Sequence, residues 1–399
     1  MKLSLQKNPN VASDRRVIRL VAVIEAVTVT GPAKNLIEFA RRAQTPSAGL
    51  PAVALSIVTF QRGNGSSNAF VSAARQAGGE IDVLHERFRF DPRVIGQLRE
   101  IVERRSPDIL QTHNVKSHFL VRFSGIGRRC PWIAFHHGYT STDLKMLLYN
   151  QLDRCSLPSA RREVTVCRAF ADQLARRGVR PERIQVLHNS VAKWTPPQQS
   201  EIDALRTELG IAPGTRVVLA VGRFSREKAQ IDAIGALAAL RRQAPDLPVV
   251  LLLVGEGPER THLEAAARAL ALQEQVLFAG QRSRVAPFYA LADALVLPSH
   301  SEGSPNVLLE AMAAGLPVAA TSVGGVPEIA THERTALLAP PAAPEQLSAA
   351  LLRLLTDRDL AAGLAANAAA LVAAHYSPEA YYQSLVELYR DFLTAEAPR

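Results

Sequence analysis

The stretch ALVLPSHSEGSPNVLLEAMAAGLPVAAT, residues 294–321, decides the fold. It opens with an apolar run at 294–297, continues through a loop into a helical pattern, and ends in a second apolar run at 317–321. Short apolar runs without polar alternation are typical of strands buried on both faces. Two such strands joined by a helix form a right-handed crossover, so this stretch predicts a parallel β-sheet.

The same alternation of short apolar runs and helical segments extends along the rest of the 399 residues. Candidate strands in the first half lie at 17–24, 53–60, 81–84, 108–111, 132–136, 164–167 and 184–187. Those in the second half lie at 216–221, 249–254, 276–278, 294–297, 317–321 and 336–338. These are too many strands for one compact sheet in this order. We therefore predict an α/β protein of two doubly wound, Rossmann-like domains that face a central cleft.

The boundary between the two domains is expected near 191–213. The segment KWTPPQQS at 193–200 has two prolines and no apolar periodicity, which favours a linker. We predict a first domain at 1–195 and a second at 196–376. From Ser377 onward the pattern indicates a helix, with Ser377 as its N-cap.

Composition places the chain among ordinary globular proteins. Hydrophobic residues make up 47% and charged residues 21%, and three cysteines occur without a CxxC pair. No window contains 18 consecutive apolar residues, and the first 16 residues contain no apolar core of a secretory signal. These features predict a protein of the reducing cytoplasm.

The net charge of +9 is unevenly distributed. Residues 1–200 carry 30 Lys and Arg against 15 Asp and Glu, whereas residues 201–399 carry 16 against 22. A basic first half suits an anionic partner such as a lipid headgroup, a phosphate-bearing acceptor or a nucleic acid. Alternatively, adjacent arginines such as Arg104 with Arg105 and Arg128 with Arg129 only solvate helix ends. Aromatic residues make up only 6% and are not interleaved with the cations, which disfavours nucleic acid.

The loop and helix start at 301–312 combine features of an anion site. Pro305 suits the first turn of a helix, and Gly303 lets the backbone approach a ligand closely. The free N–H groups and the dipole of that helix would face an anion. Glu302 in the loop and Glu310 in the helix are eight residues apart. Alone, such a pair is more often a cap and a solvated glutamate.

In its context, EGSPNVLLEAMAAGLPV resembles the E-x7-E donor signature of the retaining glycosyltransferases of family 4. The resemblance implies the two-domain GT-B fold and a nucleotide-sugar donor, UDP- or GDP-linked. It implies that Glu310 binds the ribose and that Glu302 holds hydroxyls of the transferred sugar. The further donor-binding positions that it implies in this stretch are Gly303, Ser304, Asn306 and Val307.

Four more segments of the second half resemble the same family. GRFSREKAQ at 222–230 places Gly222, Arg223 and Lys228 after a strand, and the resemblance assigns the two cations to the donor diphosphate. Two fixed cations would stabilise the charge that develops on a leaving diphosphate. VGEGPER, FAGQRSR and TSVGGVPEI are glycine-bearing turns after strands, and the first two supply Gly255 and Arg282 as candidate donor-binding residues.

The first half resembles the family less sharply. Gly31 lies at a strand-to-helix turn where the family commonly has two adjacent glycines. AFHHGYT at 134–140 resembles the family's His-Gly, which selects His137 as the residue near the transferred sugar. His113 and Lys116 in QTHNVKSH are either acceptor-side residues or parts of a rim loop. The helix at 377–393 resembles the family's C-terminal helix, which packs back on the first domain.

Neither a metal nor another cofactor is expected. The DxD pair of metal-dependent glycosyltransferases has one counterpart, Asp357 and Asp359, but a helical pattern follows it, so we interpret it as a helix start. The histidines at 113, 118, 136 and 137 have no partner at the spacing of a structural zinc site.

We therefore predict a retaining, metal-independent glycosyltransferase. It would move a sugar to a glycan or lipid-linked acceptor in polysaccharide or glycoconjugate biosynthesis, in the cytoplasm or peripherally on the inner face of the membrane. The alternatives are a nucleotide-sugar epimerase or a phosphorylase of the same fold, and a non-enzymatic protein that binds anions or nucleic acid through the basic half.

Overall fold

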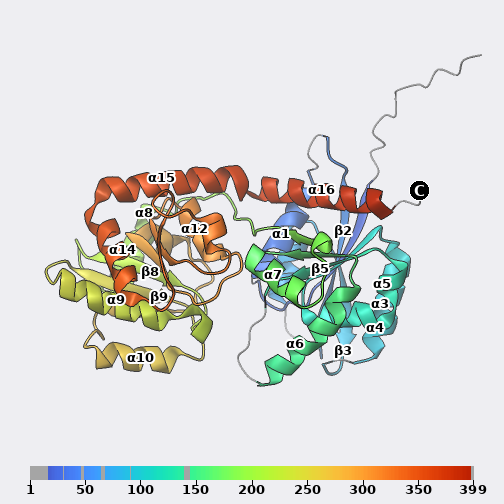
Figure 1. Ribbon diagram of the computed structural model, residues 1–399, viewed down its shortest axis with the longest axis horizontal. Coiled ribbons are helices and arrows are strands. Elements are labelled where there is room, and N and C mark those ends of the chain that lie inside the picture. The colour runs from blue at the N-terminus through green and yellow to red at the C-terminus, as the bar shows by residue number, and fades with distance from the viewer. Residues whose placement is uncertain are drawn as a thin grey trace, which may run out of the picture. The chain divides into compact units, whose positions relative to one another are not determined.

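The computed structural model describes residues 17–29, 31–45, 49–63, 68–89, 91–138 and 144–396. The chain forms two compact units, one of Met1–Glu163 with Tyr382–Arg399 and one of Val164–Tyr381. Figure 1 shows an α/β arrangement in each, with helices packed on twisted sheets. The prediction of two doubly wound α/β domains is confirmed.

The first sheet has seven strands in the order β3-β2-β1-β4-β5-β6-β7. The pairs from β3 to β5 are parallel. The strands are β1 (Ile18–Val23), β2 (Val53–Arg62), β3 (Glu80–Glu86), β4 (Ile109–Thr112), β5 (Trp132–His136), β6 (Arg162–Thr165) and β7 (Ile184–Val186). The helices between them are α1 (Gly31–Ala43), α2 (Ala69–Gln76), α3 (Arg93–Arg105), α4 (Val115–Ser124), α5 (Ile126–Arg129), α6 (Leu144–Ser156) and α7 (Arg168–Arg176).

The second sheet has six parallel strands in the order β10-β9-β8-β11-β12-β13. They are β8 (Arg216–Val221), β9 (Val249–Val254), β10 (Val276–Gly280), β11 (Ala294–Leu297), β12 (Val318–Thr321) and β13 (Leu337–Ala339). The helices are α8 (Gln199–Glu208), α9 (Gln230–Gln243), α10 (Arg260–Ala269), α11 (Ala286–Leu291), α12 (Asn306–Ala313), α13 (Val326–Ile329), α14 (Pro344–Thr356) and α15 (Arg358–His375).

Both faces of the second sheet are covered, as the uniformly apolar strands predict. Along β8, Val218 and Ala220 join a core cluster with α9, α10 and α14, whereas Val217 and Leu219 join one with α8, α11, α12 and α15. Figure 1 shows α9 and α10 on one side of the sheet and α8 and α12 on the other. Side chains alternate between the faces of a strand, so a run that is apolar at every position buries both faces.

Each sheet reverses its strand order at one point, between β1 and β4 in the first sheet and between β8 and β11 in the second. In open parallel sheets, ligands bind beyond the carboxyl ends of the strands at this switch point. The loops after β8 and β11 contain the segments 222–230 and 298–305. The loop after β4 contains His113.

The C-terminal helix α16 (Pro378–Glu396) supplies core residues to the first unit from Tyr382 onward. The Phe39 ring of α1 lies with its centroid 5.1 Å from that of Tyr382 and 6.2 Å from that of Tyr389. The first compact unit ends at Glu163 and the second begins at Val164. Strands β6 and β7 nevertheless pair into the first sheet. The predicted boundary at 195 and the domain limits built on it stay predictions.

Among the described residues, one helical stretch, 358–395, is long and apolar enough by composition to cross a membrane. An 18-residue window within this stretch has a mean hydropathy of 1.3, which its many alanines raise, and 22% of that window is buried. Core helices meet the same criterion, so this is weak support for a span.

Candidate functional site

Two glycine turns meet backbone to backbone at the carboxyl ends of β8 and β9. Gly222 donates its N–H to the Val254 carbonyl at 2.9 Å. A Cβ added to Gly255 would lie 1.9 Å from the Gly222 oxygen, and one added to Gly257 would lie 2.2 Å from the Phe224 oxygen. No side chain fits between these loops, so the glycines permit the close approach that places the following residues.

Lys228 and Glu302 form the electrostatic centre of this edge of the sheet. Lys228 ends the short 3₁₀ turn η3 (Arg226–Lys228), and its Nζ lies 2.8 Å from each carboxylate oxygen of Glu302. Ser299 donates its hydroxyl to Glu302 Oε1 at 2.6 Å. The Glu302 side chain is 4% exposed and that of Lys228 is 32% exposed. The buried carboxylate is thus charge-paired, while the ammonium still reaches solvent.

The backbone of Glu302 rests on the turn after β12. A Cβ on Gly324, whose φ is +53°, would lie 1.7 Å from the Glu302 carbonyl oxygen. A Cβ on Gly325 would lie 1.9 Å from the Gly303 oxygen. The segment TSVGGVPEI therefore supports the acidic loop by direct contact and fixes the depth of Glu302.

Arg223 differs from Lys228 in being exposed. No ion pair holds its guanidinium within the part of the chain that the structure describes. The Arg223 carbonyl accepts a hydrogen bond from Gln230 Nε2 at 2.9 Å, which fixes the backbone and leaves the cation available. Arg223 and Lys228 thus provide two positive charges on one loop.

The start of α12 is held by a residue that the sequence analysis missed. Asn189 donates its backbone N–H to Ser304 Oγ at 2.9 Å, and its side-chain amide donates to the Ser304 carbonyl at 2.7 Å and to Asn306 Oδ1 at 2.9 Å. The helix begins at Asn306, so Pro305 precedes it rather than lying in its first turn. Val307 is half-buried beside them. Asn189 follows β7 in HNS, a polar end to an apolar run that was the available signal.

Glu310 is oriented by a second missed residue, Tyr289. The Tyr289 hydroxyl donates to Glu310 Oε2 at 2.8 Å, and burial, followed by the charge of Glu310, raises the pKa of Tyr289 well above its usual value. Trp194 lies edge-on to the Tyr289 ring at 6.4 Å. A neutral phenol that must donate fixes one carboxylate oxygen and leaves Glu310 suited to accept hydroxyl hydrogen bonds.

Arg282 contacts residues outside the group around Lys228 and Glu302. Its guanidinium donates to Glu208 at 2.5 Å and to the Ala279 carbonyl at 2.9 Å, and it lies 5.7 Å from the Phe288 ring centroid. These contacts connect β10 to α8 and α11. Its predicted donor-binding role stays a prediction.

In the first unit, His113 and His137 lie after neighbouring strands, β4 and β5. Their ring planes are within 10° of parallel with centroids 5.6 Å apart, and His113 Nδ1 lies 3.3 Å from His137 Nε2. Burial, then the charges of His136 and His118, lowers the pKa of His137 to about 3. Burial also lowers the pKa of His113, so both histidines are neutral at physiological pH.

Gly31, the candidate donor-binding residue of the first unit, is the first residue of α1.

Lys116 is a buried ion-pair residue. Its Nζ lies 2.5 Å from Glu86 Oε2, 3.2 Å from Glu25 Oε1 and 3.9 Å from the Phe60 ring centroid, and the side chain is 2% exposed. These contacts join α4 to the strands. An acceptor role for Lys116 stays a prediction, and its ammonium already has two carboxylate partners.

A group of buried polar side chains lies close to the histidine pair. His118 Nδ1 lies 2.5 Å from Asp153 Oδ1, and His136 Nδ1 lies 3.6 Å from Asp153 Oδ2. Burial opposes ionisation of Asp153, yet the two histidines hold its pKa below the usual range. Neighbouring Glu163 is fully buried, and neither of its carboxylate oxygens has a hydrogen-bond partner in the described part of the chain.

Glu163→Gln is expected to stabilise the protein in a pH-dependent manner. Burial, then the charge of Asp153, raises the pKa of Glu163 from 4.5 to about 8. The native state therefore retains a proton that the unfolded state loses, so this residue lowers stability as the pH rises from 4.5 to about 8. We expect the variant to gain on the order of 1–3 kcal/mol at pH 8 and almost nothing near pH 4.5. Urea unfolding at several pH values measures this, and a gain independent of pH would contradict it.

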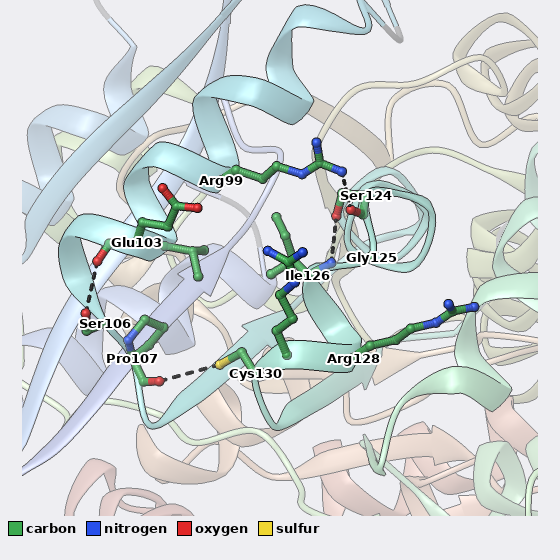
Figure 2. Close-up of a pocket in the computed structure, with 11 residues that line it drawn as sticks. Arg99, Glu103, Ser106, Pro107, Ser124, Gly125, Ile126, Arg128 and Cys130 are labelled. Atoms are coloured by element: carbon green, nitrogen blue, oxygen red, sulfur yellow. Dashed lines mark hydrogen bonds between the residues drawn. The ribbon is translucent and has the colours of Figure 1, made fainter.

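A cavity of about 470 Å³ lies apart from all of these residues. Figure 2 shows it between the ends of α3 and α4 and helix α5, with Arg99 reaching over to Ser124. Arg99 donates to the Ser124 carbonyl at 2.7 Å and so caps the end of α4. The cavity lies beside helix-to-strand connections, and none of the predicted site residues lines it.

The described residues contain no group of three or more His, Cys, Asp or Glu side chains arranged to hold a metal ion. Asp357 of the DxD pair caps α15 by accepting a hydrogen bond from the Leu360 N–H at 3.0 Å, as interpreted from the sequence.

Comparison with known proteins identifies both halves. The family model "Glycosyl transferases group 1" matches residues 201–371, and "Glycosyl transferase 4-like domain" matches residues 47–190. N-acetyl-alpha-D-glucosaminyl L-malate synthase of Bacillus anthracis is 26% identical over 76% of this chain and 80% of its own length. D-inositol 3-phosphate glycosyltransferase of Corynebacterium urealyticum is 34% identical over 51% of this chain and 50% of its own.

Solved structures share the fold along almost the whole chain. HepE of Anabaena, crystallised with UDP and glucose, superposes with a TM-score of 0.77 at 21% identity, covering 94% of this chain and all of HepE. WaaG, a glycosyltransferase involved in lipopolysaccharide biosynthesis, superposes with a TM-score of 0.68 at 19% identity, covering 93% of this chain and 99% of WaaG. The chain is a glycosyltransferase of the GT-B fold and belongs to glycosyltransferase family 4.

Proposed function

We propose that the enzyme transfers a hexose, with retention of configuration and without a metal, from a UDP- or GDP-linked donor to a glycan or lipid-linked acceptor in polysaccharide or glycoconjugate biosynthesis. The observation that carries this proposal is the contact between Lys228 and Glu302 at the switch point of the second sheet. It joins a cation suited to a phosphate and a carboxylate suited to sugar hydroxyls in one pair.

The donor would lie along this edge of the sheet. Glu310, held by Tyr289, accepts hydrogen bonds from the ribose hydroxyls. Arg223 and Lys228 bind the diphosphate and offset the negative charge that grows as the C1–O bond breaks. Their two positive charges take the part that a divalent cation has in metal-dependent transferases. HepE, with the same fold, was crystallised with UDP-glucose, which supports a nucleotide-sugar.

Glu302 would exchange partners when the donor binds. Lys228 holds both of its oxygens here, and a diphosphate oxygen competes for the same ammonium. One carboxylate oxygen is then free to accept from a sugar hydroxyl while Ser299 still donates to Oε1. His137 is proposed as the contact from the first domain. The acceptor hydroxyl attacks the face that the diphosphate leaves, and its proton passes to the departing diphosphate.

The first experiment is a panel of UDP-, GDP-, ADP- and dTDP-linked sugars, scored by thermal shift and by donor hydrolysis in EDTA. A ligand at about 100 times its Kd stabilises a protein by about 2.7 kcal/mol, so the matching donor should raise Tm by several degrees. Glu310→Ala removes hydrogen bonds to a charged acceptor, each of about 1.5–3 kcal/mol, and should weaken binding at least tenfold.

Glu274→Ala is the matched control, since Glu274 is an exposed carboxylate of the same domain. Equal binding by Glu310→Ala and wild type would rule out this site for the donor. Loss of activity in EDTA would overturn metal independence, and interconversion of the donor sugar without an acceptor would favour the epimerase alternative.

We also propose that the first domain docks on an anionic membrane surface. Phe123 of α4 is 57% exposed, and its ring centroid lies 4.4 Å from that of Phe119. The Arg122 guanidinium lies over the Phe123 ring, 5.6 Å from its centroid. Arg128 and Arg129 of α5 are exposed nearby in sequence. By contrast, Arg104 and Arg105 form ion pairs with Asp82 and Glu80.

This docking predicts sedimentation with vesicles that contain phosphatidylglycerol, decreasing as salt rises. Each cation near such a surface contributes about 1 kcal/mol, so Arg128→Glu with Arg129→Glu should weaken binding at least tenfold. The control reverses two exposed arginines of the other unit, Arg268 and Arg358. Vesicle binding that does not depend on salt concentration, or equal effects of the two double variants, would refute this proposal.

A further inference from the structure

Four side chains form a continuous hydrogen-bonded chain from the C-terminal helix to His137. The Tyr389 hydroxyl of α16 donates to Gln111 Oε1 on β4. Gln111 Nε2 lies 2.6 Å from His113 Nε2, and His113 Nδ1 lies 3.3 Å from His137 Nε2. Tyr389, Gln111 and His113 are buried, so water does not compete for these bonds. All four residues belong to the first unit.

Every hydrogen bond along this chain donates in the same direction, from Tyr389 toward His137. The phenol donates to the amide oxygen, so the amide nitrogen of Gln111 faces His113. An amide nitrogen only donates, which makes His113 Nε2 an acceptor. A neutral imidazole carries one proton, so that of His113 lies on Nδ1 and points to His137 Nε2. His137 therefore accepts at Nε2 and carries its own proton on Nδ1.

Both imidazoles are held neutral by their surroundings. Burial, then the charges of the neighbouring histidines, holds the pKa of His113 well below its usual value, and that of His137 is also lowered. The Asp153 carboxylate is directed at His118 and His136 rather than at this chain. An imidazolium would have two N–H donors and would disrupt the chain, so neutrality and direction support each other.

We propose that Tyr389 is a positioning residue that sets the tautomer of His137, acting through Gln111 and His113. In a free neutral imidazole both tautomers are available, and the hydrogen bond at one nitrogen decides which is present. The chain presents Nδ1–H of His137 as a donor to a substrate hydroxyl. The catalytic consequence rests on the proposed contact of His137 with the transferred sugar, whereas the tautomer itself does not.

The test is the tautomer of His137 in full-length protein labelled with ¹⁵N-histidine, read from long-range ¹H–¹⁵N correlations without ligand. The resonances are assigned by their loss in His137→Asn. We expect wild type to carry the proton on Nδ1, and Tyr389→Phe to populate the Nε2–H form. Tyr382→Phe is the matched control, because Tyr382 is equally buried on the same helix and forms no link of the chain.

Wild type protonated at Nε2 would overturn the proposal without any variant, as would an unchanged tautomer in Tyr389→Phe. Once a donor is known, Tyr389→Phe should lower kcat about fivefold to tenfold with little change in donor KM, and Tyr382→Phe should not. A shifted tautomer with unchanged kcat would leave the positioning chain standing and remove His137 from the catalytic site. The two failures are therefore distinguishable.

Discussion

Lys228→Met is expected to lower kcat by about 100-fold to 1,000-fold, the usual cost of removing one fixed group that stabilises developing negative charge. Lys228 Nζ is the cation nearest the buried Glu302 carboxylate, at 2.8 Å from both oxygens. Its loss removes a charge from the diphosphate and leaves Glu302 without a counter-ion. Initial rates of donor hydrolysis and of transfer measure the effect.

Two controls separate these consequences. Arg226→Met removes a cation from the same 3₁₀ turn, but the Arg226 side chain is 92% exposed and 3.6 Å from Glu259, so it should change kcat by less than a few-fold. The double variant Lys228→Met with Glu302→Gln removes both charges. It should be more stable than Lys228→Met alone but no more active. Lys228 is 32% exposed, so the stability lost in the single variant should fall below the ~3–5 kcal/mol of a fully buried pair. A single variant with near wild-type kcat would contradict the role of Lys228.

Gly324→Ala is expected to abolish activity and to destabilise the second domain by about 3 kcal/mol or more. The new Cβ would lie 1.7 Å from the Glu302 carbonyl oxygen, a distance that forces the acidic loop to move. The residue also has φ +53°, which an alanine adopts at a cost of roughly 1–2 kcal/mol. Denaturant unfolding and donor binding measure the two effects.

Gly315→Ala isolates the steric part of this effect. Gly315 has φ +69° and nothing within 4 Å of an added Cβ, so it carries only the conformational cost. We expect the Gly315 variant to lose roughly 1 kcal/mol and to keep its activity. Equal behaviour of the two variants would show that the contact between the turn after β12 and Glu302 does not matter.

The architecture was predictable because its signal is local. Every strand from β1 to β13 overlaps one of the predicted ranges, although β6 begins at Arg162, two residues before the predicted 164–167, and residues 294–321 fold as the predicted strand–helix–strand unit. Glycine turns were visible for the same reason: Gly255 and Gly324 occur where backbone meets backbone. The helix α8 was missed, since its polar sequence extends the proline-rich linker.

The supporting residues of the site were not predictable because their partners are distant in sequence. Tyr389 and Gln111 are 278 positions apart, and Asn189 and Ser304 are 115 apart. Nothing in the local pattern of Tyr289 shows that its hydroxyl orients Glu310. The surroundings of Lys116 were unpredictable for the same reason, because the burial of its ammonium depends on Glu86, 30 positions away.

The central claim is that the donor binds at the switch point of the second sheet. Hydrogen–deuterium exchange with and without the donor selected by the panel tests it most directly. We predict protection of the amides at 222–230 and 299–311, lost in Glu310→Ala. Protection confined to other segments, such as the cavity lining at 99–130, would contradict it.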